Sequence, residues 1–310
     1  MTDAADERDP LRSATVVVVN WNLPDLTIRC VGALVEDGVD PARIVLVENG
    51  STEESTAQLR AALPDVRLLR LEKNVGYARA ANRGAAALPG DRYLFVNNDA
   101  FVVRPGSIRR LMASLDRADV GLAVPRLLNE DRTLQPNVVP ITTPATAFIG
   151  ASGLSRLVPN RWQPSWGHHW DHGSSRPIQA ANGTVLAARA ELWAQLGGWV
   201  ERELMFAEDL DLCWRASKRG WLVWFESEAE FVHLGNASGR RHWSDRRRSQ
   251  MVGRAEGALI RSELSRPKAE VALFFMCAGL LARIAYFALK RETEATTSLR
   301  GMLSGYLQGE

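Results

Sequence analysis

Two hydrophobic periodicities alternate over the first 125 residues. Helical spacing of apolar residues covers 26–36, 53–63 and 76–88. Short apolar runs rich in β-branched residues, typical of buried strands, occur at 15–19, 43–47, 66–71, 92–96 and 120–124. The alternation predicts βαβ units, and therefore an α/β fold whose mostly parallel sheet is covered by helices on both faces.

Short polar residues follow the first four predicted strands. They are Asn20, Trp21 and Asn22 after the first strand, Glu48 and Asn49 after the second, Asn74 after the third, and Asn97, Asn98 and Asp99 after the fourth. Ligands of parallel sheets bind at the carboxyl ends of the strands. We therefore expect these side chains to surround a ligand.

The pattern changes in the second half of the chain. Residues 136–178 are rich in Pro, Gly, Ser, Trp and His without clear periodicity, so we expect a long loop or a partly ordered lid there. A helix at 206–219 and a strand at 221–225 follow. After Gly239 the chain becomes basic and then helical to its end.

The composition is that of a globular protein, with 46% hydrophobic and 24% charged residues. A net charge of +2 gives no chain-wide field that would favour nucleic acid as a partner. Cys30, Cys213 and Cys277 lie far apart without CxxC spacing, so neither a disulfide framework nor a structural zinc site is predicted. A cytoplasmic location fits, since residues 1–13 lack the apolar run of a secretory signal.

Residues 271–289 form an apolar run about as long as a bilayer-spanning helix, interrupted by Arg283. Three arrangements stay open: a packed helix pair or homodimer surface, contact with the membrane interface, and a true span. The first is favoured, and the charge of Arg283 argues against the span.

Asp99 directly follows a predicted buried strand. A buried carboxylate needs a cation or hydrogen-bond donors, so Asp99 is either a ligand of Mg²⁺ or Mn²⁺ or the cap of the next turn. A metal at this place would bridge the phosphates of a nucleoside diphosphate. His233, after another apolar run, is either structural or a second metal ligand opposite Asp99.

Three acids occur within 208–211, at the start of a predicted helix. Helix N-termini favour acids, which is one explanation. At helical spacing Glu208, Asp211 and Arg215 share a face, whereas Asp209 points toward a more apolar side. A general base for an acceptor hydroxyl is the other explanation.

Two further segments have candidate chemistry. Three Trp and three His occur within 162–172, which indicates a sugar-binding lid or simple packing, while HHxxH is a weak metal motif. Residues 239–254 contain six Arg and one Asp. They form either a solvated helix face or a binding site for a diphosphate. The diphosphate would belong either to the donor or to a polyprenyl-linked acceptor at a membrane.

In order and spacing, the motifs together resemble a family 2 glycosyltransferase of the GT-A fold, close to bacterial rhamnosyltransferases. The similarity extends from about Thr15 to Ser238. Its motifs are VVVVNWN at 16–22, VENGS at 47–51, NVGYARAANRG at 74–84, FVNNDA at 95–100, NGTVLAARAELWAQLGGWVERELMFAEDLDLCWRASKRG at 182–220 and FVHLGNAS at 231–238.

The resemblance implies a division of the chain. A frayed tail at 1–13 precedes a GT-A domain at 14–238, and a basic, helical extension follows at 239–310. The domain has a nucleotide-sugar-binding half at 14–125 and an acceptor-binding half at 126–238.

The resemblance also implies roles for single residues. The nucleoside would contact Asn20, Trp21, Asn22, Glu48 and Asn49, with Glu48 accepting from a pyrimidine imide. The ribose and diphosphate would be lined by Asn74, Gly76, Arg79, Asn82, Asn97 and Asn98. Metal binding would rest on Asp99, the diphosphate, water and His233, because NND keeps only the last acid of the DxD-like motif. Asp209 would be the base, with Glu208 as the fallback. The acceptor would contact Gly183, Trp166, Trp170 and Arg215.

The implied activity is inverting transfer of a sugar to a hydroxyl of a glycan or polyprenyl-diphosphate-linked acceptor in cell-envelope polysaccharide synthesis. The favoured donor is dTDP-L-rhamnose, which supplies L-rhamnose. The enzyme would be located at the inner face of the cell membrane or free in the cytoplasm. The alternatives are a UDP-hexose transferase with a soluble acceptor and a non-catalytic scaffold. A sugar-phosphate nucleotidyltransferase is disfavoured, because NWNLPD stands where its Gly-rich phosphate loop should follow the first strand.

Overall fold

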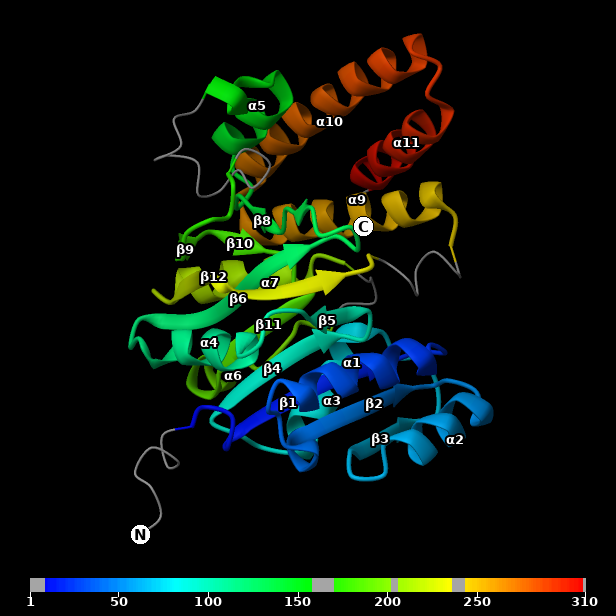
Figure 1. Cartoon of the computed structure of the whole chain (residues 1–310). Helices are drawn as coiled ribbons and strands as arrows, with labels where there is room; N and C mark the ends of the chain where they lie inside the picture. Colours follow the sequence, from blue (N-terminus) through cyan, green and yellow to red (C-terminus); the bar gives the residue numbers. More distant parts are fainter. Residues whose placement is uncertain (1–8, 158–169, 202–205, 236–242, 309–310) are drawn as a thin grey trace.

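The computed structural model describes residues 9–157, 170–201, 206–235 and 243–308. Within these ranges, ten strands form one curled sheet with helices on both faces, and a group of helices extends from one side of it (Figure 1). The strand order along the sheet is β3-β2-β1-β4-β11-β6-β12-β5, with β7 beside β6 and β9 beside β12. A separate pair joins β10 to β8.

The strands are β1 (Ala14–Asn20), β2 (Ile44–Asn49), β3 (Arg67–Leu71), β4 (Arg92–Asn97), β5 (Ala100–Val102), β6 (Val120–Leu128), β7 (Leu134–Gln135), β8 (Val138–Val139), β9 (Arg176–Ile178), β10 (Ala180–Ala181), β11 (Val185–Arg189) and β12 (Leu222–His233). The helices are α1 (Pro24–Glu36), α2 (Glu53–Ala62), α3 (Tyr77–Ala87), α4 (Ser107–Ala113), α5 (Pro144–Ser152), α6 (Ala190–Leu196), α7 (Glu208–Lys218), α9 (Asp245–Glu263), α10 (Arg266–Leu289) and α11 (Thr293–Leu307).

The strands and helices predicted for the first half are confirmed. β1 is buried along nearly its whole length between β2 and β4, and all pairs among the first four strands are parallel. Strands buried on both faces need continuous apolar runs, which is why the β-branched segments identified them. The carboxyl ends of β1, β2 and β4 lie at one edge, as the sequence predicts.

Beyond β4 the sheet is mixed rather than parallel. β11 lies antiparallel between β4 and β6, with Val185 opposite Val96, and β12 then pairs parallel with β6. Consequently the turn before β11 reaches the carboxyl end of β4, where the Asn97 N–H donates to the Thr184 carbonyl at 2.8 Å. Periodicity alone does not give strand direction, so the sequence could not predict this insertion.

The prediction of a long loop at 136–178 is wrong for most of the described part of this segment. It contains β8, α5, a short 3-10 helix at Leu154–Leu157 and β9. Thr143 and Thr146 form a capping box at the start of α5, and Pro144 occupies its first turn. The segment 158–169 lies outside the described residues, and with it Trp162, Trp166, His168 and His169.

The tail expected at 1–13 is also shorter than predicted. Leu11 is buried in the core, and Asp9 forms an ion pair with Arg109. Residues from Asp9 onward therefore pack against the domain.

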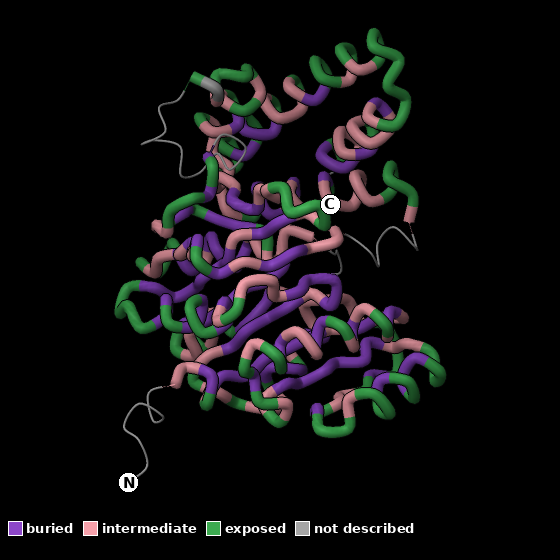
Figure 2. Tube along the Cα trace, viewed as in Figure 1, coloured by how far each residue is buried: buried purple, intermediate pink, exposed green. Residues whose placement is uncertain are grey.

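The predicted helical extension is confirmed, and α5 joins α9, α10 and α11 to form what we call the arm (Figure 1). α9 and α11 pack closely because glycines lie where they meet. A Cβ atom added to Gly253, Gly301 or Gly305 would approach a backbone carbonyl oxygen of the other helix to 2.3 Å. Burial is deep in the sheet domain, whereas the outer side of the arm is largely exposed (Figure 2).

Gly305→Ala is expected to destabilise the protein by about 1–3 kcal/mol, because backbone must move to admit the methyl group. The matched control is Gly32→Ala in α1, where a Cβ atom would meet nothing within 4 Å and helix propensity favours alanine. Urea unfolding of both variants measures the difference. Equal stabilities would show that close glycine packing does not hold α9 to α11.

Candidate active site

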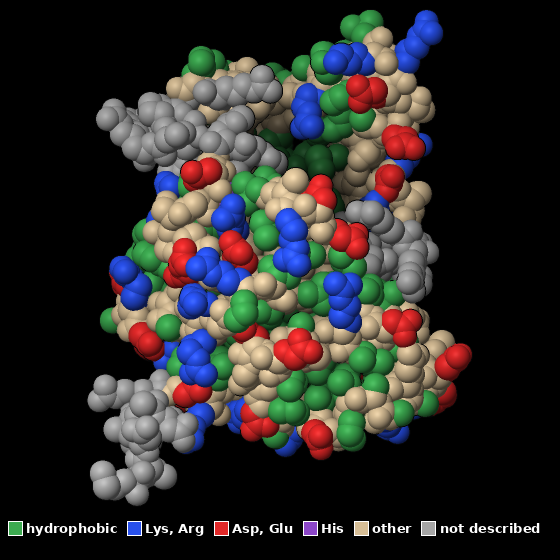
Figure 3. Space-filling view, in the orientation of Figure 1, with side chains coloured by type: hydrophobic (Ala, Val, Ile, Leu, Met, Phe, Trp, Pro, Cys, Tyr) green, Lys and Arg blue, Asp and Glu red, His purple; other side chains and the backbone are tan. Residues whose placement is uncertain are grey.

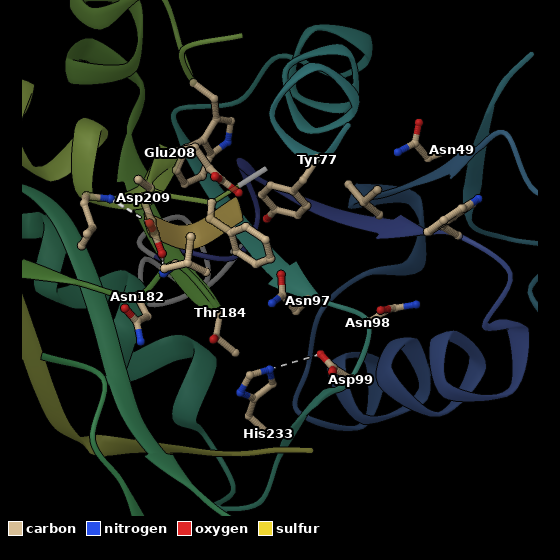
Figure 4. A pocket seen from close by; sticks show the side chains of 18 of the residues that line it. Asn49, Tyr77, Asn97, Asn98, Asp99, Asn182, Thr184, Glu208, Asp209 and His233 are labelled. Carbon is tan, nitrogen blue, oxygen red and sulfur yellow. Dashed lines mark hydrogen bonds and ion pairs between the residues drawn. The ribbon is translucent and has the colours of Figure 1, made fainter. Parts of the chain in front are cut away.

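A cavity of about 450 Å³ opens at the carboxyl edge of β1 and β4. α7 and the turn before β11 form one wall, and α9 of the arm contributes Val252 and Glu256 (Figure 4). Its lining brings together Trp21, Asn49, Asn74, Asn97, Asn98, Asp99, Gly183, Glu208, Asp209 and His233, ten of the residues singled out in the sequence. Predicted donor, metal, base and acceptor positions thus meet in one space.

Asp99 and His233 face each other at one end of the cavity, with 3.3 Å between Asp99 Oδ1 and His233 Nε2. Pairing of β5 with β12 brings them together, since His233 lies opposite Ala100. The Gln135 amide donates to the Asn129 side chain and the His233 carbonyl, which leaves its oxygen 2.7 Å from His233 Nδ1. Nδ1 therefore donates to Gln135, and in the neutral ring the Nε2 lone pair points toward Asp99.

This arrangement fits a divalent cation. A carboxylate oxygen and an imidazole lone pair face the same point, and a carboxamide fixes the tautomer as outer partners of metal ligands do. Among the described residues no group of three or more His, Cys, Asp or Glu forms a complete metal site. The pair would supply two ligands, leaving the other positions to phosphate oxygens and water.

The two asparagines before Asp99 differ. Asn97 faces the cavity, whereas the Asn98 amide donates to Asn20 Oδ1 at 3.2 Å and to Thr27 Oγ1 at 3.0 Å (Figure 4). Asn98 thus anchors the turn to the start of α1. Asn98 also lines the cavity, so its predicted contact with the donor stays a prediction beside this structural role.

Glu48 is also structural here. Its side chain is fully buried, and its carboxylate accepts from Asn20 at 3.0 Å, from Ser55 and from Ser51. Burial raises the pKa of Glu48, and these hydrogen bonds oppose the rise. Neither Glu48 nor Asn20 lines the cavity, and the direct contact with a pyrimidine base that the resemblance implies stays a prediction.

Asn49 and Asn74 shape the wall of the cavity between β2 and α3. The Asn49 amide donates to Asn74 Oδ1 at 3.2 Å, and its oxygen accepts from the Val75 N–H at 3.0 Å. Gly76 begins α3 at φ 87°, a value that favours glycine. It shapes the backbone without lining the cavity.

Three further predicted donor contacts also lie outside the cavity lining. The Asn22 side chain accepts from the Thr52 N–H. Arg79 pairs with Glu201 at 3.4 Å, and Asn82 exchanges hydrogen bonds with the Trp199 backbone. These contacts hold the walls of the cavity, and the contacts of the three residues with the donor stay predictions.

Asp209 lies in the first turn of α7, inside the cavity. Its Oδ2 accepts from the Gly183 N–H at 2.7 Å, and its Oδ1 accepts from the Leu210 N–H at 2.8 Å. A Cβ atom on residue 183 would approach Asp209 Cβ to 2.9 Å, so glycine permits this bond. Phe206 and Ala207, just before the helix, have φ values of 82° and 63°, which is typical of strained backbone near functional sites.

Glu208 and Asp209 form a coupled acid pair. Burial, and then the neighbouring Asp209, raise the pKa of Glu208 to about 8, and burial also raises the pKa of Asp209. Glu208 and Asp209 are half-buried, and the negative charge of each carboxylate opposes ionisation of the other. The backbone N–H groups donate to Asp209, while Glu208 Oε2 has no hydrogen-bond partner within the described ranges. Glu208 is thus the acid whose pKa is raised to about 8, whereas two backbone N–H groups stabilise the carboxylate of Asp209.

The expected acceptor side is mostly corrected. Trp170 is buried, stacked on His172 with 4.4 Å between ring centroids, and covered by the Arg176 guanidinium. Arg215 pairs with Asp211 at 2.5 Å and donates to the carbonyls of Leu196 and Gly198. Both are structural. Gly183 does line the cavity, and Trp166 lies outside the described residues.

The arginines of 239–254 do not line the main cavity in the part that the structure describes. Arg248 pairs with Asp245 and lines a neighbouring cavity of about 370 Å³, and Arg247 donates to Gln250. Arg240 and Arg241 lie outside the described residues.

Several cavity residues were missed: Tyr77, Asn182, Thr184, Trp199 and Glu256. Tyr77 and Asn182 lie inside motifs that the sequence had already marked. Glu256 had a weaker signal, as one of three acids in the arginine-rich α9. Its carboxylate accepts from the Tyr306 hydroxyl, and burial, together with the nearby Asp209, raises its pKa.

The chain is similar in sequence to known glycosyltransferases. The model of the family "Glycosyl transferase family 2" matches residues 15–167. An N-acetylglucosaminyl-diphospho-decaprenol L-rhamnosyltransferase of Mycobacterium tuberculosis is 30% identical over 205 residues, which span 62% of this chain and 66% of the relative. The O-antigen biosynthesis protein RfbC of Myxococcus xanthus is 28% identical over 245 residues, 75% of this chain and 18% of that protein.

Two solved structures share the fold. The mannosyltransferase PcManGT from Pyrobaculum calidifontis, in complex with GDP-Man and Mn²⁺, aligns with a TM-score of 0.59 at 17% identity, over 96% of this chain and 87% of its own. The structure of GalNAc-T7 with UDP, GalNAc and Mn²⁺ aligns with a TM-score of 0.60 at 15% sequence identity, over 94% of this chain and 56% of its own. These similarities identify the GT-A fold.

Glu208→Gln is expected to flatten the pH dependence of stability. Glu208 keeps its proton in the folded state up to about pH 8, against an ordinary value of 4.5. Protonated Glu208 thus contributes its full stability when the pH is below its ordinary pKa. This contribution is lost as the pH rises through the pKa that Glu208 has in the folded state. Melting temperatures from about pH 5 to about pH 9 should fall less in the variant than in the wild type. Glu36→Gln on the exposed side of α1 is the control, and identical slopes in all three proteins would contradict the assignment.

Proposed function

The chain belongs to glycosyl transferase family 2, and we propose that it transfers a sugar from a nucleotide donor to an acceptor hydroxyl with inversion. The observation that supports this most directly is the shared cavity. Asp99 and His233 lie at one end of it, and Asp209 lies at the wall opposite (Figure 4). A metal-held leaving group and a base are the two requirements of the reaction.

Metal dependence is supported by the charges of the cavity. Its described lining contains four carboxylic acids, Asp99, Glu208, Asp209 and Glu256, and no Lys or Arg. A nucleoside diphosphate carries negative charge and would be repelled without a cation. Mg²⁺ or Mn²⁺ at Asp99 and His233 would neutralise the diphosphate as it leaves.

The remaining steps belong to the chain itself. Trp21, Asn49 and Asn74 would hold the nucleoside side of the donor, next to Asn97. Ionised Asp209 would take the proton of the acceptor hydroxyl while that oxygen bonds to the anomeric carbon from the face opposite the leaving diphosphate. The Gly183 N–H keeps the Asp209 carboxylate aimed into the cavity. Protonated Glu208 would act as a hydrogen-bond donor beside Asp209.

The favoured donor is dTDP-L-rhamnose, and the favoured acceptor is a lipid-linked saccharide at the cytoplasmic side of a membrane. The support is the rhamnosyltransferase relative, whose name includes an acceptor on decaprenol. The matched region spans 66% of that relative, just under two thirds of its length. A UDP-hexose donor with a soluble acceptor is the alternative.

Asp209→Asn should reduce transfer by on the order of 10²–10⁴-fold while donor binding persists, because only the proton acceptor is lost. Sugar transfer is measured by product formation and donor binding by calorimetry. Glu208→Gln is the matched control and should retain activity. Normal transfer by Asp209→Asn together with an inactive Glu208→Gln would make Glu208 the base.

Asp99→Asn should abolish manganese-dependent donor binding, since the carboxylate ligand becomes an amide. In the wild type, a panel of dTDP-, UDP- and GDP-sugars with manganese should show a thermal shift on the order of 5 °C for the true donor. The shift should vanish with EDTA. A shift from GDP-sugars alone would exclude the dTDP and UDP donors. Absence of nucleoside diphosphate release from every sugar nucleotide would favour a non-catalytic scaffold.

A further inference from the structure

Exposed apolar side chains are concentrated on the arm. Ten large hydrophobic side chains are exposed in the described part of the chain, and nine of them belong to the arm and the 3-10 turn after α5. They are Phe148, Leu154, Leu157, Val271, Phe274, Leu281, Tyr286, Leu289 and Leu307. A patch of this kind marks a surface that is covered by another molecule.

α10 is the centre of this patch. α5 packs on one side of it, where Gly279 lies against Ala151, and Phe148 contacts Phe275 with ring centroids 5.1 Å apart. α10 is the one described helix that is long and apolar enough to cross a bilayer, and only 17% of its most apolar window is buried. Its outer side exposes 67% of Phe274 and 55% of Leu281.

Positive charges border the apolar side chains. α10 and α11, with the residues between them, contain six Lys or Arg and three Glu. Arg266 and Lys268 lie at the start of α10, and Lys290 and Arg291 follow its end. Lys290 lies 4.7 Å from the centroid of the Tyr286 ring. Basic and aromatic residues flanking an apolar helix are typical of segments that lie at a membrane interface.

We propose that this apolar face docks on the surface of an anionic lipid bilayer, with α10 lying along the interface. The flanking Lys and Arg residues would contact lipid phosphates while Phe274 and Leu281 enter the acyl region. A second copy of the chain fits less well, because a two-fold interface places the same patch against itself and would bring like charges together. A bilayer span fits less well because α5 and α11 pack along α10, which has Arg283 within its apolar run.

The inner side of the arm adjoins the catalytic cavity. A groove of about 250 Å³ between α5, α10 and α11 is lined by Ala147, Met276, Leu280 and Tyr306. Figure 3 shows a hollow beside the arm with hydrophobic side chains in its depth. The Tyr306 hydroxyl donates to Glu256, which lines the catalytic cavity. The pair of Tyr306 and Glu256 thus joins the groove to the catalytic cavity, so docking of the arm would bring a lipid-borne acceptor to the base. Delivery of the acceptor rests on the proposed function, whereas the docking does not.

The test is co-sedimentation of the full chain with vesicles of phosphatidylcholine alone and of phosphatidylcholine mixed equally with phosphatidylglycerol. The wild type should bind the anionic vesicles at least about tenfold more tightly, because basic residues add to the apolar contact. Phe274→Glu and Leu281→Glu should each lose most of this binding. The matched control is Val35→Glu, which should bind as the wild type does. It adds the same charge at the one exposed large hydrophobic residue of the described chain that lies outside both the arm and the 3-10 turn after α5.

Three outcomes would overturn the proposal. They are equal sedimentation of Phe274→Glu and Val35→Glu, wild-type binding that ignores the anionic lipid, and a wild-type dimer that Phe274→Glu converts to a monomer without loss of vesicle binding. Circular dichroism confirms that the variants fold. Release of nucleoside diphosphate in detergent solution, with a soluble acceptor, should be unchanged in all three variants. Failure of docking is thereby distinguished from failure of the proposed chemistry.

Discussion

The hydrogen bond from the Gly183 N–H to Asp209 is the contact on which the site depends. It joins the start of α7 to the turn before β11, and that turn is held to the end of β4 by the bond between Asn97 and Thr184. Because β11 is inserted between β4 and β6, the base is fixed relative to the strand that ends in Asp99. A side chain at residue 183 would separate them.

The second constraint is electrostatic. Four carboxylic acids and five asparagines lie in the described lining of the cavity, and burial and the neighbouring Asp209 raise the pKa of Glu208. This concentration of acid suits a base and excludes an anionic ligand that arrives without a cation. Asp99 and His233 lie where such a cation would relieve the repulsion, so the proposed metal site and the proposed base depend on the same concentration of acid.

The arm is part of the site rather than an appendage. Glu256 of α9 lines the cavity, and the Tyr306 hydroxyl from α11 holds it. Close glycine packing between these two helices fixes that geometry. Since the same arm carries nearly all the exposed apolar side chains, the acceptor side of the cavity and the apolar surface are built from one group of helices.

The sequence by itself determined the first four strands, the edge at which the cavity opens, and three residues that line it, Asp99, Asp209 and His233, because alternating periodicity and strand-end polarity are local properties. Only the tertiary structure decided which side chains reach the cavity. Glu48, Asn98 and Arg215 occur in the expected motifs. In the folded chain, however, they contact Ser51, Thr27 and Asp211, respectively. The insertion of β11 and the arrival of Glu256 also depend on contacts between distant segments. Such contacts leave no periodic signal in the chain.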